Sequence, residues 1–267
     1  MMRSIIILCL GLALVLGPSG TGRAAQSPGA PLEELQYRVS LGVLGEVARV
    51  QLRLYRVGDR YLAEFTGVPQ GAGKLVSRWL PERYQTEMIL EGGRLKPLVY
   101  REEFQSKGQR IVKEYRFDYA QGVMEVWRGV DGREPKKTWQ TPLKEAVYDP
   151  LTLLYNLRLG AWGPLAGGQA LKVAALPDPE PREMRIDLGP ETGRGRKIMM
   201  TVKSQGSEVE NGQFFLFCTP QWVPLEAWFR VLSFAKLSGQ LLNPGGIMKD
   251  GLPPAPDLPL ADQKIRK

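Results

Sequence analysis

The sequence predicts a mainly β protein, built from antiparallel strands with one short helix. From Leu35 onward, apolar and polar residues alternate with a period of two, which is the pattern of half-buried strands. Turns that contain glycine interrupt the alternation at short, regular intervals, as in sandwiches and barrels. One segment, 149–159, carries apolar residues at helical spacing instead. Together these patterns predict hairpin-linked strands and a single helix.

Residues 1–25 have the pattern of a cleavable signal peptide. A positive start that ends at Arg3 is followed by an uncharged apolar run over 5–17, and small residues continue to Ala24 and Ala25. The run is shorter than the roughly 20 apolar residues of a membrane-spanning helix. We therefore expect a periplasmic or secreted protein with no stable membrane span after cleavage. An uncleaved anchor is the alternative interpretation.

The body of the chain, 33–240, is predicted to be a single β-rich domain. Before the helical segment, the predicted strands are 35–41, 48–54, 61–65, 84–90, 95–104, 111–119 and 123–130, and Asp131-Gly132 after the last of them is a strong hairpin signal. After it, strands are predicted over 170–175, 184–188, 197–203, 213–219 and 225–237. Residues 243–267 are rich in proline and predict an extended, largely disordered tail.

The helical segment has clear signals at both ends. Asp149 is a good N-cap residue, Pro150 suits the first turn, and Gly160 is a stop signal. We expect a short helix that packs on the sheet and plugs one end of it.

Several short stretches resemble one bacterial family. They are the opening strand 35–41, the Gly-Gly-Arg-Leu-Lys-Pro stretch 92–97, the Arg-Phe-Asp strand 116–118 and the apolar-Pro-apolar strand entry 222–226. The most specific is 149–158, which is similar to an Asp-x-Leu-Ser-x-x-Tyr-x-x-Arg helix, with Thr152 in the place of Ser. Glu226 stands where a basic residue is expected.

On these residues the chain resembles the domain of unknown function 3108, a family of exported proteins. The resemblance covers nearly the whole body. It implies a curled antiparallel sheet or half-barrel, lipocalin-like or lipoprotein-carrier-like, and it brings no established activity.

The composition argues against the common catalytic chemistries. There is no histidine, which excludes Ser-His-Asp and Cys-His catalysis and the commonest zinc sites. Without the signal peptide, Cys218 is the sole cysteine, so we expect a buried core thiol, with an intermolecular bridge as the alternative. Residues 70–75 imitate part of a phosphate loop, but Leu75 stands where Ser or Thr is required. We expect no cofactor, no metal and no enzymatic activity.

Paired carboxylates are the remaining route to hydrolysis. Glu102 and Glu103 are adjacent on a predicted strand, so their side chains should point to opposite faces. Asp118 and Glu125 are placed to meet across a hairpin, although surface pairing with neighbouring arginines explains them equally well. A carboxylate-based hydrolase is thus the third functional hypothesis.

The chain is basic, with a formal net charge of +8. The positive residues are scattered, and the sequence carries no recognisable nucleic-acid-binding signature. Lipid head groups, anionic envelope polymers or an acidic envelope protein are the partners that such a surface favours. Solvation of outward strand faces explains the same charges without a partner.

An aromatic set on the central strands is the candidate ligand site. We expect the side chains to line one inner face, and two interpretations are open: they fill the core of a curled sheet, or they line a cavity for a lipid or acyl chain. At the end of the helix, an arginine either meets an anionic head group or the helix's own terminal carbonyls. The candidate residues are Tyr115, Phe117, Tyr119, Trp127, Tyr155 and Arg158.

The leading hypothesis is therefore a non-enzymatic envelope protein that binds an apolar or amphiphilic ligand, such as a lipid. A protein-interaction or scaffold module of the envelope is the alternative.

Overall fold

The structure is a computed structural model that describes residues 29–71, 73, 81–106, 108–176, 180–202, 213–232 and 235–246. The expected signal peptide, 1–25, and its cleavage site lie outside the described residues, as do residues 247–267 of the expected tail. Three of the six residues that imitate a phosphate loop, 72, 74 and 75, also lie outside them.

The described chain forms fifteen strands, one α-helix and two short 3-10 helices. In chain order they are β1 (Glu33–Leu41), η1 (Gly42–Leu44), β2 (Glu46–Val57), β3 (Arg60–Pro69), β4 (Pro81–Glu91), β5 (Arg94–Ser106), β6 (Gln109–Asp118), β7 (Val123–Val130), β8 (Lys136–Pro142), β9 (Val147–Tyr148), α3 (Pro150–Arg158), β10 (Ala170–Ala175), β11 (Arg182–Thr192), β12 (Gly195–Val202), β13 (Gln213–Cys218), β14 (Pro224–Leu232), β15 (Ala235–Leu241) and η3 (Pro244–Gly246).

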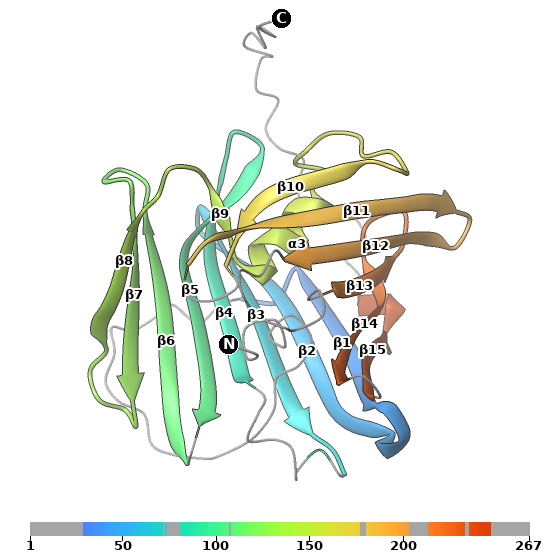
Figure 1. Cartoon of the computed structure of the whole chain (residues 1–267), viewed down its shortest axis with the longest axis horizontal. Coiled ribbons are helices and arrows are strands. Elements are labelled where there is room, and N and C mark those ends of the chain that lie inside the picture. Colours follow the sequence, from blue (N-terminus) through green and yellow to red (C-terminus); the bar gives the residue numbers. More distant parts are fainter. Residues whose placement is uncertain are drawn as a thin grey trace, which may run out of the picture.

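All the strands belong to one curled sheet in which β1 is shared by two limbs. The first limb, β2–β8, continues outward from one edge of β1, and the second limb, β9–β15, leads back to its other edge. Every neighbouring pair is antiparallel except β9 and β10. Figure 1 shows β10–β12 crossing in front of α3, over the ends of the first limb's strands. This confirms the predicted mainly β fold with one short helix.

Each predicted strand is present, although β3 and β11 extend four residues past their predicted ends, and there are three further differences. The apolar stretch predicted as one strand over 225–237 is two strands, β14 and β15, although no glycine or proline separates them. The short β9 and the polar edge strand β8 were not predicted, because β8 carries just one large apolar residue, Trp139.

The helix lies in the interior, between the two limbs. Leu153 and Leu157 pack in the apolar cluster formed mainly by the second limb. Leu151 and Tyr155, on another side of the helix, pack in the cluster formed mainly by the first limb. The short helix predicted to pack on the sheet thus fills the space between its curled halves.

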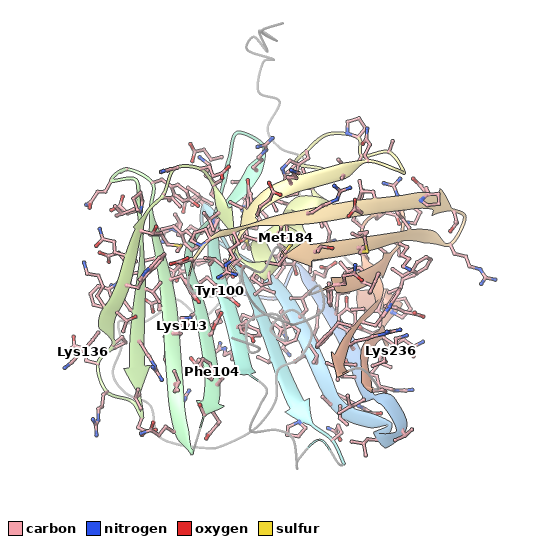
Figure 2. All side chains as sticks on the ribbon, viewed as in Figure 1. Tyr100, Phe104, Lys113, Lys136, Met184 and Lys236 are labelled. Carbon is pink, nitrogen blue, oxygen red and sulfur yellow. The ribbon has the colours of Figure 1, made fainter. Side chains whose placement is uncertain are left out.

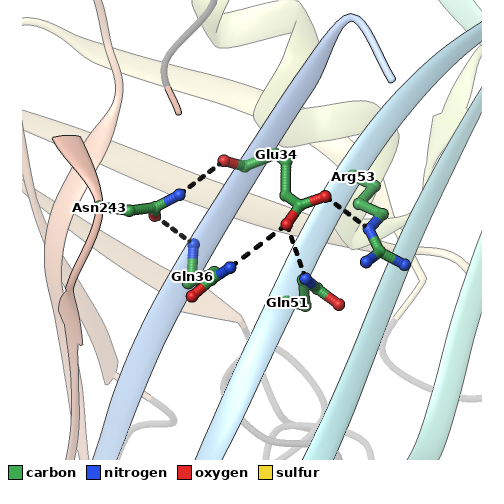
Figure 3. A network of polar contacts seen from close by, with 5 residues as sticks. All are labelled: Glu34, Gln36, Gln51, Arg53 and Asn243. Atoms are coloured by element: carbon green, nitrogen blue, oxygen red, sulfur yellow. Dashed lines mark hydrogen bonds and ion pairs between the residues drawn. The ribbon is translucent and has the colours of Figure 1, made fainter. Parts of the chain in front are cut away.

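A polar network on the outer face holds the end of β15 against β1 (Figure 3). The amide of Asn243 accepts from the backbone N–H of Gln36 at 2.6 Å and donates to the carbonyl of Glu34 at 3.0 Å. The Glu34 carboxylate in turn accepts from Gln51 and Arg53 at 2.8 and 3.0 Å. The prediction that the disordered tail starts at 243 is therefore wrong for residues 243–246, which are hydrogen-bonded to the sheet.

Candidate ligand-binding cavity

The start of α3 is fixed by a buried aspartate. The Asp149 carboxylate accepts from the backbone N–H groups of Leu151 and Thr152 at 2.9 and 3.1 Å, and from the hydroxyl of Thr152. It also accepts from the Thr86 hydroxyl on β4 at 2.8 Å. Burial raises the pKa of Asp149, while these hydrogen bonds oppose the rise. The N-cap thus attaches the helix to the first limb as well as satisfying its first turn.

Asn156 attaches the middle of the helix to β5. Its amide donates to the carbonyl of Leu95 and accepts from the backbone N–H of the same residue, both at 2.8 Å. The Asn156 side chain is fully buried. Its amide gives the backbone of Leu95 two hydrogen bonds of the kind that a neighbouring strand provides.

The helix ends with a buried ion pair. The guanidinium of Arg158 donates to the carboxylate of Glu33 on β1, and the two side chains are 5% and 0% exposed. The Tyr155 hydroxyl is 3.5 Å from the same carboxylate. Glu33 is thus a protein partner that neither interpretation of Arg158, a head group or the helix's own carbonyls, had named. The motif residues Asp149, Thr152 and Arg158 all find buried partners that position the helix.

An apolar cavity of about 100 Å³ lies beside the helix, between the limbs. The first limb and β1, the first turns of α3, and the second limb all contribute to its wall. Its lining residues are Tyr37, Val39, Val50, Leu52, Phe65, Tyr84, Tyr100, Pro150, Leu151, Leu153, Leu154, Met200, Phe214, Leu216, Pro224, Ala227 and Gly239. Figure 2 labels Tyr100 beside the strands of the first limb, and this residue is 1% exposed.

Aromatic rings form a ladder along the first-limb side of the cavity. Phe65, Tyr84, Tyr100 and Tyr115 follow one another across β3–β6 with ring centroids 5.6, 6.0 and 5.6 Å apart. The Tyr84 hydroxyl is buried and has no hydrogen-bond partner among the described residues. Burial, with the charge of Glu102, raises the pKa of Tyr84. The ladder therefore places a buried hydroxyl group, that of Tyr84, in a wall that is otherwise mainly apolar.

Glu102 lies directly opposite Tyr84 in the pairing of β4 with β5. Its side chain is buried, and desolvation raises the pKa of its carboxyl to about 7, although the nearby charge of Lys113 lowers it. Lys113 stands opposite Glu102 on β6. This acid is thus partly protonated at neutral pH and is able to donate as well as accept a hydrogen bond.

None of the six predicted site residues lines the cavity. Tyr115, Phe117 and Tyr155 are buried in the first-limb core, and Tyr119 is half-buried with its ring stacked on Phe117. The prediction that Trp127 shares their face is wrong. It stands on the outer face, where its indole N–H donates to Glu125 at 3.0 Å.

The reason for the error is the register of β6 and β7. Tyr115 pairs with Val126, so Val126 points inward and the next residue, Trp127, points outward. The guanidinium of Arg116 lies 4.4 Å from the Trp127 ring centroid and covers it. Residues that sequence reasoning missed, such as Phe65 and Tyr84, were on predicted strands, but no pattern showed that β3 and β4 face the helix.

The carboxylates that the sequence offered as candidate pairs each contact a different partner in the structure. Glu103 points outward and pairs with Arg101 and Arg110 at 3.0 and 2.6 Å, which confirms that it and Glu102 occupy opposite faces. Glu125 bonds Lys137 and Trp127, whereas Asp118 accepts from the backbone of Gln121.

Cys218 is buried, as predicted, and burial raises the pKa of its thiol to about 12. Among the described residues there is no cluster of metal-ligating side chains. None of the helices in the described part of the chain is long and apolar enough to cross a membrane.

A second, more polar cleft of about 490 Å³ borders Arg196 and Trp222. Arg196 is already occupied: it donates to the Leu165 carbonyl and to Glu191, and its guanidinium lies 5.1 Å from the Trp222 ring centroid. Trp222 has a positive φ of 61° because it closes the turn between β13 and β14, donating to the Thr219 carbonyl. Both terminal nitrogens of Arg196 are thus engaged, whereas its Nε is buried without a hydrogen-bond partner among the described residues.

Fold and cavity together define a protein whose curled antiparallel sheet encloses a helix and an apolar cavity. The chain belongs to the family described as "Protein of unknown function (DUF3108)", whose model matches residues 36–191, more than half of the chain. This confirms the resemblance seen in the sequence. A search of the curated proteins found no match. Among solved structures, the chain is similar to the beta-barrel-like protein of domain of unknown function DUF1849 from Brucella abortus, with 8% identity, a TM-score of 0.49, and coverage of 79% of this chain and 95% of that one.

Proposed function

We propose that this chain is a non-enzymatic protein of the cell envelope that binds the apolar part of an amphiphile between its two limbs. The observation that carries the proposal is the cavity beside α3, whose wall consists almost wholly of apolar and aromatic side chains. Several lining residues, among them Phe65, Leu154 and Ala227, are half-buried rather than fully buried, so the wall is reachable from solvent. The signal-like N-terminal pattern supports action in the periplasm or outside the cell.

The size of the cavity limits what enters it. At about 100 Å³ it is smaller than the roughly 300–1,000 Å³ of typical ligand pockets and nearer the 150 Å³ of an apolar cavity that holds benzene. We infer that one ring or the end of a short chain occupies the cavity and that the rest of the ligand lies along the half-buried entrance.

The polar groups beside the cavity favour a ligand whose entering end carries no negative charge. The Tyr84 hydroxyl has an unused hydrogen bond, and the neighbouring Glu102 carboxyl repels an anion whenever it is ionised. Arg158, the expected anion partner, is neutralised by Glu33. An uncharged ring, with or without a hydroxyl, suits these neighbours better than a carboxylate or phosphate.

The test is native mass spectrometry of the chain purified gently from its own envelope fraction. Gly239 faces the cavity from β15, and a Cβ there meets just the Arg38 carbonyl, at 4.0 Å. The Cβ that Gly239→Val adds therefore has room, and we expect the two methyl groups beyond it to occupy cavity space. Ser238→Val, one residue earlier on the other face, is the matched control.

We expect a co-purifying ligand mass on the unaltered chain and on Ser238→Val, and its loss from Gly239→Val. Circular dichroism should show that all three chains are folded. A bare mass for the unaltered chain, or equal retention by the two variants, would contradict the proposal.

The alternative of a scaffold that acts by strand addition has weaker support. The open edge of the first limb is β8, which begins with Lys136 and Lys137, both exposed, and ends at Pro142. Lysine and proline on an edge strand discourage pairing with another chain. At the opposite edge, β9 has two residues, both buried.

A further inference from the structure

We propose that one end of the sheet docks on an anionic membrane surface. The docking surface consists of the β1–β2 tip, with Val43 and Leu44, and the adjoining outer face of β12–β15, with Phe215, Trp228 and their flanking lysines. The surface lies outside the cavity, and this inference holds whether or not the cavity takes a ligand.

The β1–β2 tip exposes large apolar side chains. Val43 and Leu44, in η1, are 104% and 52% exposed, and Val68 at the same end of the sheet is 44% exposed. Among the described residues just one other large apolar side chain is this exposed, Leu32, which lies at the opposite end of β1. Single exposed apolar residues are ordinary, but their concentration at one end marks a contact surface.

The outer face beside the tip carries stacked aromatic rings. Phe215 and Trp228 have ring centroids 5.5 Å apart and planes inclined by 11°. They point outward because Phe214 and Leu216 face the core. Trp228 pairs with Ser238 on β15, which pairs with Ser40 on β1, two residues before the tip. By this pairing the rings lie close to the tip, which is the blue β1–β2 turn in Figure 1.

Lysines flank these rings. The Lys197 ammonium is 4.8 Å from the Phe215 ring centroid and 5.7 Å from that of Trp228, and the Lys236 ammonium is 5.1 Å from Trp228. Figure 2 shows Lys236 on the outside of the second limb. Arg230 pairs with Lys236 in the sheet and is also exposed. Glu226 is an exposed acid in the same region, so the cations outnumber the acid among these residues.

Charge and shape together favour a lipid surface. Tryptophan and lysine are the side chains that settle at a bilayer interface, where the ring sits among head groups and the ammonium meets phosphate. A protruding valine–leucine tip reaches below the head groups, as in other peripheral proteins. Cations attract anionic lipids over about a Debye length, so binding should weaken with salt.

The test is vesicle flotation with the chain recovered from the exported fraction, its N-terminus determined by intact mass. Vesicles of phosphatidylcholine alone are compared with vesicles that contain about 30% phosphatidylglycerol. We expect binding to the anionic vesicles, at least fivefold weaker binding to the zwitterionic ones, and a further loss at high salt. The variant Val43→Ser/Leu44→Ser and the variant Lys197→Gln/Lys236→Gln should each lower binding at least fivefold.

Matched controls come from the remote exposed residues. Leu32→Ser and Lys136→Gln should bind like the unaltered chain. The Gly239→Val variant should also bind like it, which separates this proposal from the ligand cavity. Absence of binding by the unaltered chain, or equal losses in the tip variant and Leu32→Ser, would overturn the proposal. Binding to soluble polyglutamate without binding to vesicles would assign the surface to an acidic protein and would overturn it too.

Discussion

The ion pair between Arg158 and Glu33 should dominate the attachment of the helix to the shared strand β1. We consider Arg158→Met, which keeps the length and much of the apolar stem of the side chain but removes its charge. Glu33 would then keep a carboxylate that is 0% exposed, with the Tyr155 hydroxyl at 3.5 Å as a weak neighbour. Removing one partner of a buried pair costs about 3–5 kcal/mol, because the other charge stays desolvated.

The companion change is Glu33→Leu together with Arg158→Met. Replacing a whole buried pair with apolar residues of similar size is often neutral, or stabilising by about 1–4 kcal/mol. We therefore expect the double variant to be more stable than either single variant by about 3 kcal/mol or more, which corresponds to a coupling energy of about 6 kcal/mol or more. Equilibrium unfolding in urea, followed by circular dichroism, measures the unfolding free energies of the unaltered chain, the two single variants and the double variant.

An exposed pair provides the reference. Arg60 and Glu87 approach to 3.3 Å, with side chains 51% and 48% exposed, and such pairs contribute about 0–1 kcal/mol. If Arg158→Met destabilises the chain no more than Arg60→Met, or if the double variant loses the sum of the single losses, the reasoning about burial is refuted.

Three further changes test other parts of the structure. Burial raises the pKa of the Glu102 carboxyl from 4.5 to about 7. The stabilisation that comes from the protonated form of Glu102 is therefore fully present below about pH 4.5 and is lost as the pH rises through 7. The loss is about 3 kcal/mol, so Glu102→Gln should flatten the fall in unfolding free energy between pH 5 and 8; an unchanged slope in urea titrations would count against this. Asp149→Ala should cost about 2–3 kcal/mol, since it removes the N-cap and leaves buried donors unpaired; a loss below 0.5 kcal/mol in the same assay would contradict that. Gly195→Ala should lower the melting temperature strongly, because its Cβ would lie 2.0 Å from the Cys218 carbonyl oxygen at a φ of 132°, whereas Gly193→Ala, with nothing within 4 Å, should change it little.

The helix shows what local sequence signals achieve. Asp149, Pro150 and Gly160 predicted its ends nearly to the residue, because capping and turn chemistry act within a few residues. These local signals did not predict which side chain pairs with Arg158. The carboxylate that neutralises it, Glu33, is 125 residues away in the chain, and that distance is closed by the curling of the sheet.

The aromatic set shows where sequence reasoning fails. Alternation placed Tyr115 and Phe117 on one face correctly, since a strand's period of two is local. It could not place Trp127, because the inward face of the next strand depends on the register between strands. The cavity wall was hidden for the same reason: Tyr84, Leu153 and Phe214 come from three distant segments.

By itself, therefore, the sequence determined most of the strands, the position and ends of the helix, the burial of Cys218 and the membership of a family without an assigned activity. These properties depend on periodicity, capping and composition, which act over short stretches of chain. The tertiary structure alone decided that β1 is shared by two limbs, that Arg158 is neutralised by Glu33, and that the cavity lies beside the first turns of the helix. Those properties depend on strand register and on contacts between distant segments, which a single sequence does not encode in any local pattern.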